Sequence, residues 1–455
     1  MRALLLFLTL HLVAHAQDRT NIIFLLADDL GWTGLSGYGS DFYESPNLDR
    51  LAAEGMKFTD AYAACTVCSP TRASIMTGKY PARLHLTDFI AGQNRPWAKL
   101  TVPNWQKGLL HTHTTLAEAL KAQGYQTAMA GKWHLERPNH KAEDAPTNHG
   151  FDVAMLRPPR TRGYKMIDGR YLTDYLTDQA VAFIEKASKN EAPFFLYMSY
   201  HVPHTPIQGR KDLVDAFEKK RNPKAVHHNA NYAAMVASLD QSAGRLLHAL
   251  DALKISDNTI VVFTSDNGGL TQRYGRHDDF TENLPLRRGK GSAYEGGVRV
   301  PAIIKWPGQT KPGTICKTPI MTIDYFPTLL KAAGAHGERS TDGRDLLPLL
   351  QDPSRSLERD LFWHYPHYHA GGDSPYSAIR SGKFRLIEFH EDQTVALYDL
   401  SNDLGEQRNL AEELPDQAQA LQRRLHQWQE SVGAQKMQPN PDHDTSKATK
   451  VVKKS

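Results

Sequence analysis

Cysteine is scarce in this sequence, which has only Cys65, Cys68 and Cys316 among its 455 residues. Cysteines normally pair as disulfides in exported proteins, the class that the N-terminus of this chain indicates below. An odd count leaves at least one thiol without a disulfide partner. The spacing of Cys65 and Cys68 is that of a redox C-x-x-C pair, but such a pair opens a helix directly after a strand. Here it follows a polar, aromatic stretch, which disfavours a redox role. Whether Cys65 and Cys316 pair stays open, because sequence does not give their distance.

The sequence also lacks long apolar runs and a large excess of charge. No segment beyond the N-terminus contains the roughly 20 apolar residues that a transmembrane helix needs. Lys and Arg total 54 against 50 Asp and Glu, for a net charge of +4. A balance so close to neutral gives no nucleic-acid footprint. We therefore expect neither a membrane span nor a nucleic-acid partner.

The N-terminus has the three zones of a cleavable signal peptide. Met1 and Arg2 precede an apolar run over residues 3–13, and the small-residue stretch Ala14–Ala16 follows. This order of basic, apolar and small residues is typical of export signals, whereas the run is too short for a membrane anchor. We predict that residues 1–16 are removed and that the mature protein is secreted or periplasmic.

Buried strands and amphipathic helices alternate along the first three quarters of the chain. Short runs rich in β-branched and aromatic residues predict strands; these are residues 21–26, 126–130, 194–199, 259–264 and 300–304. Apolar residues at helical spacing predict helices over residues 47–56, 116–123 and 231–253. Such alternation indicates an α/β fold, a large mostly parallel sheet between helices, for a domain spanning residues 17–350.

The pattern changes near residue 350. Short runs at residues 376–380, 384–389 and 395–400 predict an antiparallel sheet, and residues 415–431 predict a helix. We assign residues 351–434 to this small α+β subdomain. Residues 435–455 are polar and rich in Lys, with too few large apolar groups to order themselves, so we predict a flexible basic tail.

Chemically useful side chains follow four of the predicted strands. In an open parallel sheet, ligands bind outside the carboxyl ends of the strands, so residues just after each strand are candidates for a site. They are, in chain order, Asp28 and Asp29, Lys132 and His134, His201 and His204, and Asp266 and Asn267.

The carboxylates and the amide in this set favour a hard divalent cation such as Ca²⁺ or Mg²⁺, since they supply oxygen ligands. A single Asp-Asp pair after a strand is more often a turn or a helix cap. Two oxygen-bearing pairs, Asp28-Asp29 and Asp266-Asn267, make the metal hypothesis stronger.

Cys68 begins a predicted short helix that has Pro70 in its first turn and Gly78 just beyond its end. The amide groups and dipole of a helix N-terminus favour an anion, and Arg72 is one turn further on. The simpler alternative is a buried cysteine and a surface arginine.

These segments together resemble the signature of the type I sulfatases. The resemblance begins with Cys68-x-Pro70-x-Arg72 and residues 73–78. It continues in residues 27–29, 131–134, 201–204, 265–269, 289–291 and 294–297, in order between about residue 20 and residue 400. The resemblance implies an alkaline-phosphatase-like fold, with the catalytic site in the domain of residues 17–350.

It also implies that a formylglycine-generating maturation enzyme oxidises Cys68 to the aldehyde 3-oxoalanine. The hydrated aldehyde would attack sulfur through one hydroxyl and expel sulfate with the help of the other. The implied metal ligands are Asp28, Asp29, Asp266, Asn267 and the modified residue 68. We expect Ca²⁺ ahead of Mg²⁺.

The resemblance also implies roles for other residues of the matching motifs. Arg72 would hold the nucleophile's oxygen, and Lys132 and Lys290 would bind sulfate oxygens. His204 is the expected acid for the leaving alcohol and His134 the expected base. Lys132 and His134 alternate along an extended segment and so face the same way. His201 is assigned to substrate binding.

The substrate is expected to be a sulfated polysaccharide or glycan. The stretch from Tyr80 to Asp88 is similar to bacterial carbohydrate sulfatases, and residues 364–369 mix aromatic and hydrogen-bonding groups. We predict a sugar subsite from both. Its residues are His85, Asp88, His364 and His367. The alternative for residues 364–369 is a structural aromatic loop.

Two other functions remain open. A phosphodiester or phosphonate ester hydrolase of the same superfamily can carry a similar Cys-x-Pro-x-Arg nucleophile, because phosphoryl and sulfuryl groups make similar demands. If Cys68 is never oxidised, the chain would instead be a non-catalytic protein that binds sulfated glycans.

Overall fold

The computed structural model describes residues 19–139, 141–159, 161–166, 168–271, 280–335, 341–370 and 374–447. The predicted signal peptide and the last eight residues of the predicted tail lie outside these ranges. Within them, no helix combines the length and apolar character that crossing a membrane requires.

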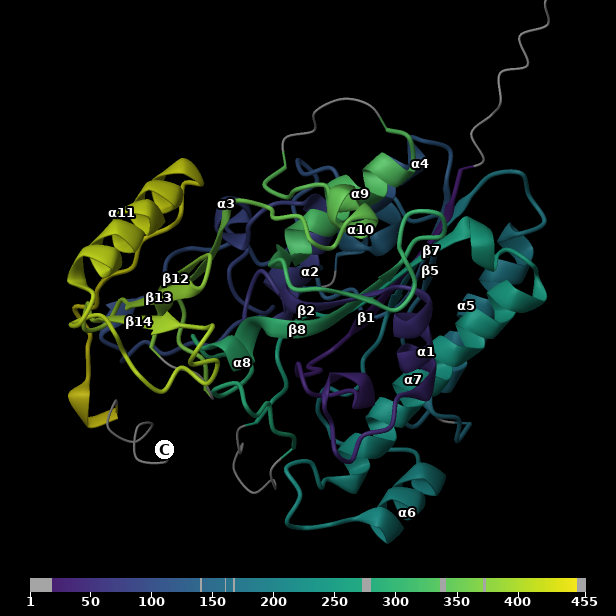
Figure 1. Cartoon of the computed structure of the whole chain (residues 1–455), viewed down its shortest axis with the longest axis horizontal. Coiled ribbons are helices and arrows are strands. Elements are labelled where there is room, and N and C mark those ends of the chain that lie inside the picture. The colour runs from purple at the N-terminus through teal and green to yellow at the C-terminus, as the bar shows by residue number, and fades with distance from the viewer. Residues whose placement is uncertain are drawn as a thin grey trace, which may run out of the picture.

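A nine-stranded sheet forms the centre of the molecule (Figure 1). Its strands run in the order β10 (Ile320–Met321), β2 (Met56–Tyr62), β8 (Arg299–Lys305), β7 (Thr259–Ser265), β1 (Asn21–Ala27), β6 (Phe194–Ser199), β4 (Gln126–Gly131) and β5 (Val153–Met155), and β9 (Thr314–Cys316) also pairs with β2. The neighbours β7, β1, β6 and β4 are parallel to one another, whereas β8 is antiparallel to β7 and β2. The predicted mostly parallel sheet is confirmed.

Helices cover both faces of this sheet (Figure 1). Along β1, Ile23 and Leu25 join one apolar core, and Ile22 and Phe24 join the other, as the two-residue period of a strand requires. The first face carries α1 (Pro46–Glu54), α5 (Leu172–Ala187) and α7 (Ala230–Ala252), with α6 (Lys211–Lys220) packed on α7. The second face carries α2 (Cys68–Thr77), α4 (Leu116–Lys121), α9 (Tyr325–Ala332) and α10 (Leu347–Gln351).

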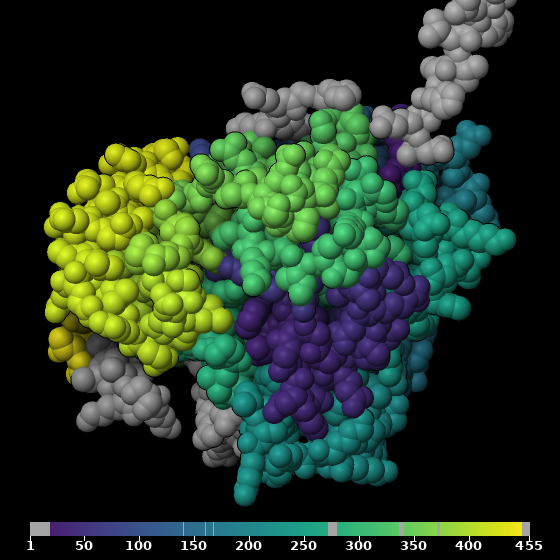
Figure 2. All heavy atoms as spheres, viewed as in Figure 1, coloured from purple at the N-terminus to yellow at the C-terminus, as the bar shows by residue number. Residues whose placement is uncertain are grey.

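A four-stranded antiparallel sheet with one helix forms the C-terminal unit, at one side of the molecule in Figure 2. Its strands are β11 (Asp360–Tyr365), β12 (Tyr376–Ser381), β13 (Phe384–Phe389) and β14 (Val395–Asp399), and α11 (Pro415–Ser431) packs against it. The indole of Trp363 on β11 donates a 2.8 Å hydrogen bond to the carbonyl of Ala63, the residue that directly follows β2 of the large sheet. The predicted sheet and helix are confirmed, with β11 as an additional strand.

The beginning of the predicted flexible tail is docked instead. β15 (Gln438–Pro439) pairs with β3 (Leu100–Thr101), and the side chain of Asn440 donates 2.7 Å hydrogen bonds to the carbonyls of Pro96 and Ala98. Backbone pairing and an amide side chain order this segment without apolar burial, which is why composition alone gave the wrong expectation for residues 435–447. Two short helices, α3 (Pro81–Leu84) and α8 (Glu295–Val298), complete the α-helices of the described residues.

A fully buried ion cluster holds the C-terminal unit against α8. Arg385 on β13 lies 2.7 Å from a carboxylate oxygen of Glu406 and donates a 2.7 Å hydrogen bond to the carbonyl of Ala293. Its Nε is 3.4 Å from the carboxylate of Glu295, and all three charged side chains are wholly buried. Removal of one member would leave charge buried without compensation.

We predict that Arg385→Ala lowers the free energy of unfolding by about 3–5 kcal/mol, the usual cost of breaking a buried ion pair. Arg408→Ala is the matched control, since Arg408 pairs with Glu413 at the surface, where such pairs contribute less than about 1 kcal/mol. Urea unfolding followed by circular dichroism measures both. Similar small losses in the two variants would contradict a structural role for the buried cluster.

Candidate active site

The carboxyl ends of β1, β4, β6 and β7 meet at one edge of the large sheet, as their parallel pairing requires. The structure brings together there the polar residues that follow these strands: Asp28, Asp29, Lys132, His134, His201, His204, Asp266 and Asn267. Backbone hydrogen bonds fix the edge, among them one from Asp266 to the carbonyl of Ala27 at 3.1 Å.

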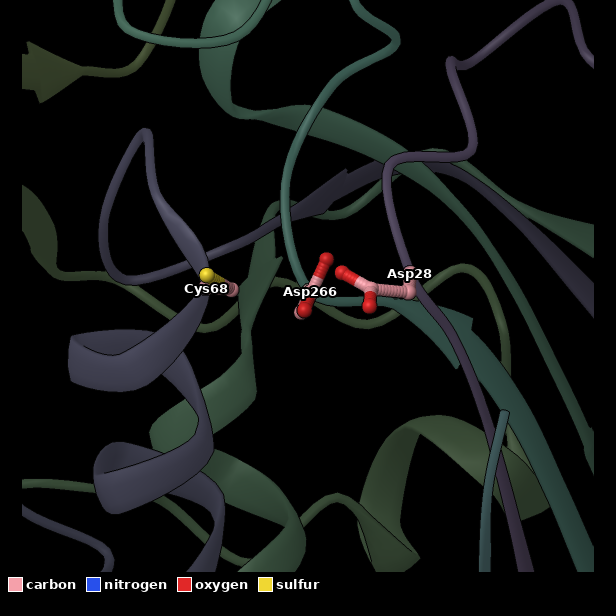
Figure 3. Close-up of side chains that lie close together, drawn as sticks. All are labelled: Asp28, Cys68 and Asp266. Carbon is pink, nitrogen blue, oxygen red and sulfur yellow. The ribbon is translucent and has the colours of Figure 1, made fainter. Parts of the chain in front are cut away.

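Two carboxylates and a thiol form the centre of this cluster. Asp28, Cys68 and Asp266 each offer an atom within 4.8 Å of the others'. Figure 3 shows them approaching from three elements: the end of β1, the start of α2 and the end of β7. Asp28, Asp29 and His204 form a second group with the same spacing.

Three basic side chains balance the three carboxylates. Arg72 is wholly buried and donates hydrogen bonds of 3.0 and 2.6 Å to one oxygen of Asp266. The ammonium groups of Lys132 and Lys290 each lie 2.6 Å from a carboxylate oxygen, on Asp28 and Asp29 respectively. Arg72 is thus bound to a carboxylate, a partner that sequence alone did not predict.

Burial and charge act against each other on these acids. Burial raises the pKa of Asp28, but Lys132 and the other nearby bases outweigh it and hold that pKa well below its usual range. Burial and the charge of Asp28 raise the pKa of Asp266 well above its usual range. The cluster therefore resists full ionisation, which a further cation would relieve.

Two oxygen acceptors in the cluster have no hydrogen-bond donor among the described residues. They are Oδ1 of Asp28 and Oδ1 of Asn267, and both are buried. The side-chain nitrogen of Asn267 donates a 2.8 Å hydrogen bond to Asp29, so the side-chain oxygen of Asn267 is the atom available to a cation. Buried acceptors normally have a partner. Oxygen atoms of carboxylate and amide groups are the ligands of Ca²⁺ and Mg²⁺, so the residues fit such an ion.

Cys68 is the first residue of α2, as the sequence predicted. Val67 before it is extended, and Gly78 ends the helix in the left-handed conformation, at a φ of 66°. Cys68 itself is only 2% exposed. The helix thus presents its N-terminal amide groups beside the acid cluster, where they favour an anion.

His134 faces Cys68. Its Nδ1 lies 3.4 Å from Sγ of Cys68, and its Nε2 donates a 2.7 Å hydrogen bond to the carbonyl of Ile90. That bond places the proton on Nε2 and leaves the Nδ1 lone pair toward residue 68. Burial, with the charges of Lys132 and Arg72, lowers the pKa of His134 to about 3.

A cavity of about 560 Å³ opens over this cluster. Residues from the sequence prediction that line it are Asp28, Cys68, Lys132, His134, His201, His204 and Lys290. The ring of His204 is 30% exposed, and its Nδ1 donates a 2.7 Å hydrogen bond to the carbonyl of Thr205. Nε2 of His204 therefore remains for a ligand, 3.7 Å from Asp29.

Other lining residues were not predicted. The hydroxyl of Tyr164 lies 2.5 Å from the carbonyl oxygen of His201 and 2.7 Å from that of His204, so its single hydrogen is shared between them and fixes their loop. Arg157 and His369 also line the cavity. The aromatic and histidine string of residues 364–369 was a signal for His369, but nothing in the pattern distinguished it from its neighbours.

The predicted sugar subsite is not assembled at this cavity. Nε2 of His85 bonds the carbonyl of Gly433 at 2.9 Å. His364 lies on β11, where its two ring nitrogens contact Ser377 at 2.8 Å and the carbonyl of Gln435 at 2.9 Å. His364 is bonded through both ring nitrogens and His85 through one, and neither residue lines the cavity over the acid cluster.

Asp88 and His367 are likewise buried in the protein, at 1% exposure each. Asp88 accepts a 2.8 Å hydrogen bond from the hydroxyl of Tyr365, and His367 bonds Thr87 at 2.8 Å. Neither lines the cavity. Tyr365 and His367 therefore join the segment of residues 87–88 to the C-terminal unit, whereas His369 of the same stretch lines the cavity.

The glycine-rich motifs serve close packing of backbone on backbone. A Cβ on Gly268 would lie 1.8 Å from the carbonyl oxygen of Gly296. Only glycine permits this approach of the two motif segments.

The three cysteines are all free and buried, and Cys65 and Cys316 belong to different apolar clusters, so they form no disulfide in this structure.

Comparison with known proteins agrees with this geometry. The family model described as Sulfatase matches residues 20–335, and that described as N-sulphoglucosamine sulphohydrolase, C-terminal, matches residues 289–435. A sulfatase of Formosa agariphila is 34% identical, over 91% of this chain and 89% of its own length. Arylsulfatase A of Homo sapiens is 32% identical, over 88% and 86%.

Among solved structures, Ps i-CgsB in complex with k-i-k-neocarrahexaose has a TM-score of 0.76 and 27% identity, covering 95% of this chain and 96% of that chain. The protein is therefore a sulfuric ester hydrolase of the alkaline-phosphatase-like fold. It belongs to the sulfatase family, as the motifs indicated.

We predict that the His134 ring stays neutral, with its proton on Nε2, from pH 8 down to pH 5. A pKa of about 3 lies far below the roughly 6.5 of an ordinary histidine, so no protonation falls in this window. Heteronuclear NMR of ring-labelled protein measures it, with His134→Asn to assign the signal. A chemical-shift titration between pH 5 and 8 would contradict the prediction.

Proposed function

We propose that this protein is a calcium-dependent sulfatase of sulfated carbohydrates, whose nucleophile is formylglycine made from Cys68. The observation that carries the proposal is the position of Cys68. It begins α2 beside an acid cluster with two buried oxygens, Oδ1 of Asp28 and Oδ1 of Asn267, that accept no hydrogen bond from the part of the chain that the structure describes. An oxidised residue 68 would lie beside both a cation and the anion-binding end of a helix.

The charge balance supports a cation in addition to the bases. Three carboxylates against Arg72, Lys132 and Lys290 leave the cluster close to neutral. A bound Ca²⁺, held by Asp28, Asp29, Asp266 and Asn267, would supply Lewis-acid activation of the hydroxyl of hydrated formylglycine. It would also give the site two excess positive charges, which matches a sulfate ester and the negative charge that develops during its cleavage.

His134 is the proposed base. Its neutral ring, held by Ile90, presents the Nδ1 lone pair to residue 68 and accepts a proton from a hydroxyl there. Its low pKa keeps the ring in the accepting form at neutral pH.

Lys132 and Lys290 are the proposed ligands of the sulfate oxygens, since both residues line the cavity and their ammonium groups lie at the acid cluster. His204 is the proposed acid for the leaving oxygen, with Nε2 toward the cavity. Burial lowers the pKa of His204 despite the nearby Asp29, so its acid form declines as pH rises toward neutrality. Esters with poor leaving groups, such as sugar alcohols, depend most on this proton.

Carbohydrate specificity is supported by the relatives and by the cavity. The solved structure of Ps i-CgsB contains an oligosaccharide, and the cavity here is of ordinary size for a small-molecule site, roughly 300–1,000 Å³. We further propose that the predicted signal peptide directs the enzyme to the secreted or periplasmic pool, where polysaccharide sulfate esters are met.

We predict that the matured enzyme carries an aldehyde at residue 68 and that Cys68→Ala abolishes hydrolysis of p-nitrophenyl sulfate, because the nucleophile is lost. Peptide mass spectrometry detects the conversion. Cys316→Ala is the matched control, since Cys316 is a buried free thiol in another apolar cluster. An active enzyme with unmodified cysteine would contradict the proposal, and faster cleavage of an aryl phosphodiester would favour the alternative hydrolase.

We predict that Ca²⁺ stabilises the chelator-treated enzyme and so raises its melting temperature. At a concentration one hundred times its Kd, bound Ca²⁺ should raise the free energy of unfolding by about 2.7 kcal/mol. Mg²⁺ should do so less, because it retains water more strongly. Asp28→Asn should remove most of the response. Asp240→Asn is the control, since this buried acid accepts hydrogen bonds from Asn47 and Leu48 and is in neither group of possible metal ligands among the described residues. An equal response in both variants would place the ion elsewhere.

A further inference from the structure

A second cavity, of about 480 Å³, adjoins the one over the acid cluster. The two share four lining residues: Lys132, His134, Arg157 and His201. Each cavity alone falls in the usual size range of small-molecule sites, roughly 300–1,000 Å³. The second cavity therefore offers room for the part of a ligand that continues beyond a sugar ring whose sulfate lies at the acid cluster.

The second cavity has apolar surface beside its charged residues. Pro146, Ala142 and Leu156 line it, and Leu156 is 43% exposed. Apolar walls with a few polar groups are the usual composition of a ligand site. The C–H faces of a sugar ring can pack on such walls while its substituents reach the charged groups.

Arg157 stands between the two cavities with its charge uncompensated. Its side chain donates a 2.7 Å hydrogen bond to the carbonyl of Thr161, and it forms no ion pair with any residue that the structure describes. Arg137, by contrast, is paired with Asp144, an acid that lines the second cavity. Asp144 is thus neutralised within the protein, whereas the guanidinium of Arg157 remains for an anion.

We propose that the second cavity binds the sugar next to the sulfated one, and that Arg157 binds an anionic substituent, a sulfate or a carboxylate, on that neighbouring sugar. The inference rests on the proposed carbohydrate sulfatase function and deepens it. The planar guanidinium suits both anions, since each offers two oxygens to parallel N–H donors.

The test compares kcat/KM on four substrates. Three are sulfated disaccharides whose neighbouring sugar carries a second sulfate, a carboxylate or no charge, and the fourth is p-nitrophenyl sulfate. Arg157→Ala should lower kcat/KM roughly 10- to 100-fold on the two charged disaccharides, the loss expected for a charge-assisted hydrogen bond. Its effect on the neutral disaccharide should be much smaller, and Arg157→Lys should recover part of the loss.

Two further variants separate charge from space. Arg162→Ala is the matched control, an exposed arginine of the same segment that lines neither cavity. Ala142→Trp narrows the second cavity and should lower kcat/KM on all three disaccharides relative to p-nitrophenyl sulfate. The wild-type ratio between the sulfate- and carboxylate-bearing substrates identifies the preferred anion.

The outcomes distinguish the two levels of the proposal. Equal losses for Arg157→Ala on charged and neutral disaccharides, or no loss on either, would overturn the role of Arg157. An Ala142→Trp enzyme that keeps the wild-type ratios would overturn the second cavity as a sugar site. A wild-type enzyme that cleaves p-nitrophenyl sulfate and none of the disaccharides would instead contradict the carbohydrate function itself.

Discussion

The packing of like charges at one edge of a parallel sheet is the constraint on which the rest of this structure depends. Asp28, Asp29 and Asp266 are buried together where β1 and β7 end, and such a group is stable only when cations surround it. Arg72 supplies one of these cations from inside α2, which fixes the helix against the sheet. The start of that helix, and with it residue 68, is thereby positioned beside the acids.

Much of this arrangement follows from sequence because each part is local. The central strands are continuous apolar runs, and polar residues stand directly after them, so parallel pairing alone predicts their meeting. Cys68, Pro70 and Gly78 mark both ends of α2 in the same way. What sequence did not predict is pairing between distant charges: Arg72, expected to hold the nucleophile's oxygen, also bonds Asp266, which lies beside Cys68.

Elements with mixed patterns were missed. α5 (Leu172–Ala187) has Thr, Asp and Tyr directly after its first residue, all weak helix formers, and its packing on α7 outweighs that preference. β2 (Met56–Tyr62) contains Lys57 and Asp60, and pairing on both sides holds it in the sheet. The sugar subsite failed for another reason: His364 and His367 have the composition of a recognition loop, but composition does not say which rings face inward.

Asp88 connects the C-terminal unit to the active site of the large domain. The hydroxyl of Tyr365, on the small sheet, holds Asp88, and two residues further on the carbonyl of Ile90 holds the ring of His134. The orientation of the His134 ring in the large domain thus depends on a residue in the last quarter of the chain. An isolated large domain would keep every acid and base of the cluster and still lack the scaffold that aims one of them.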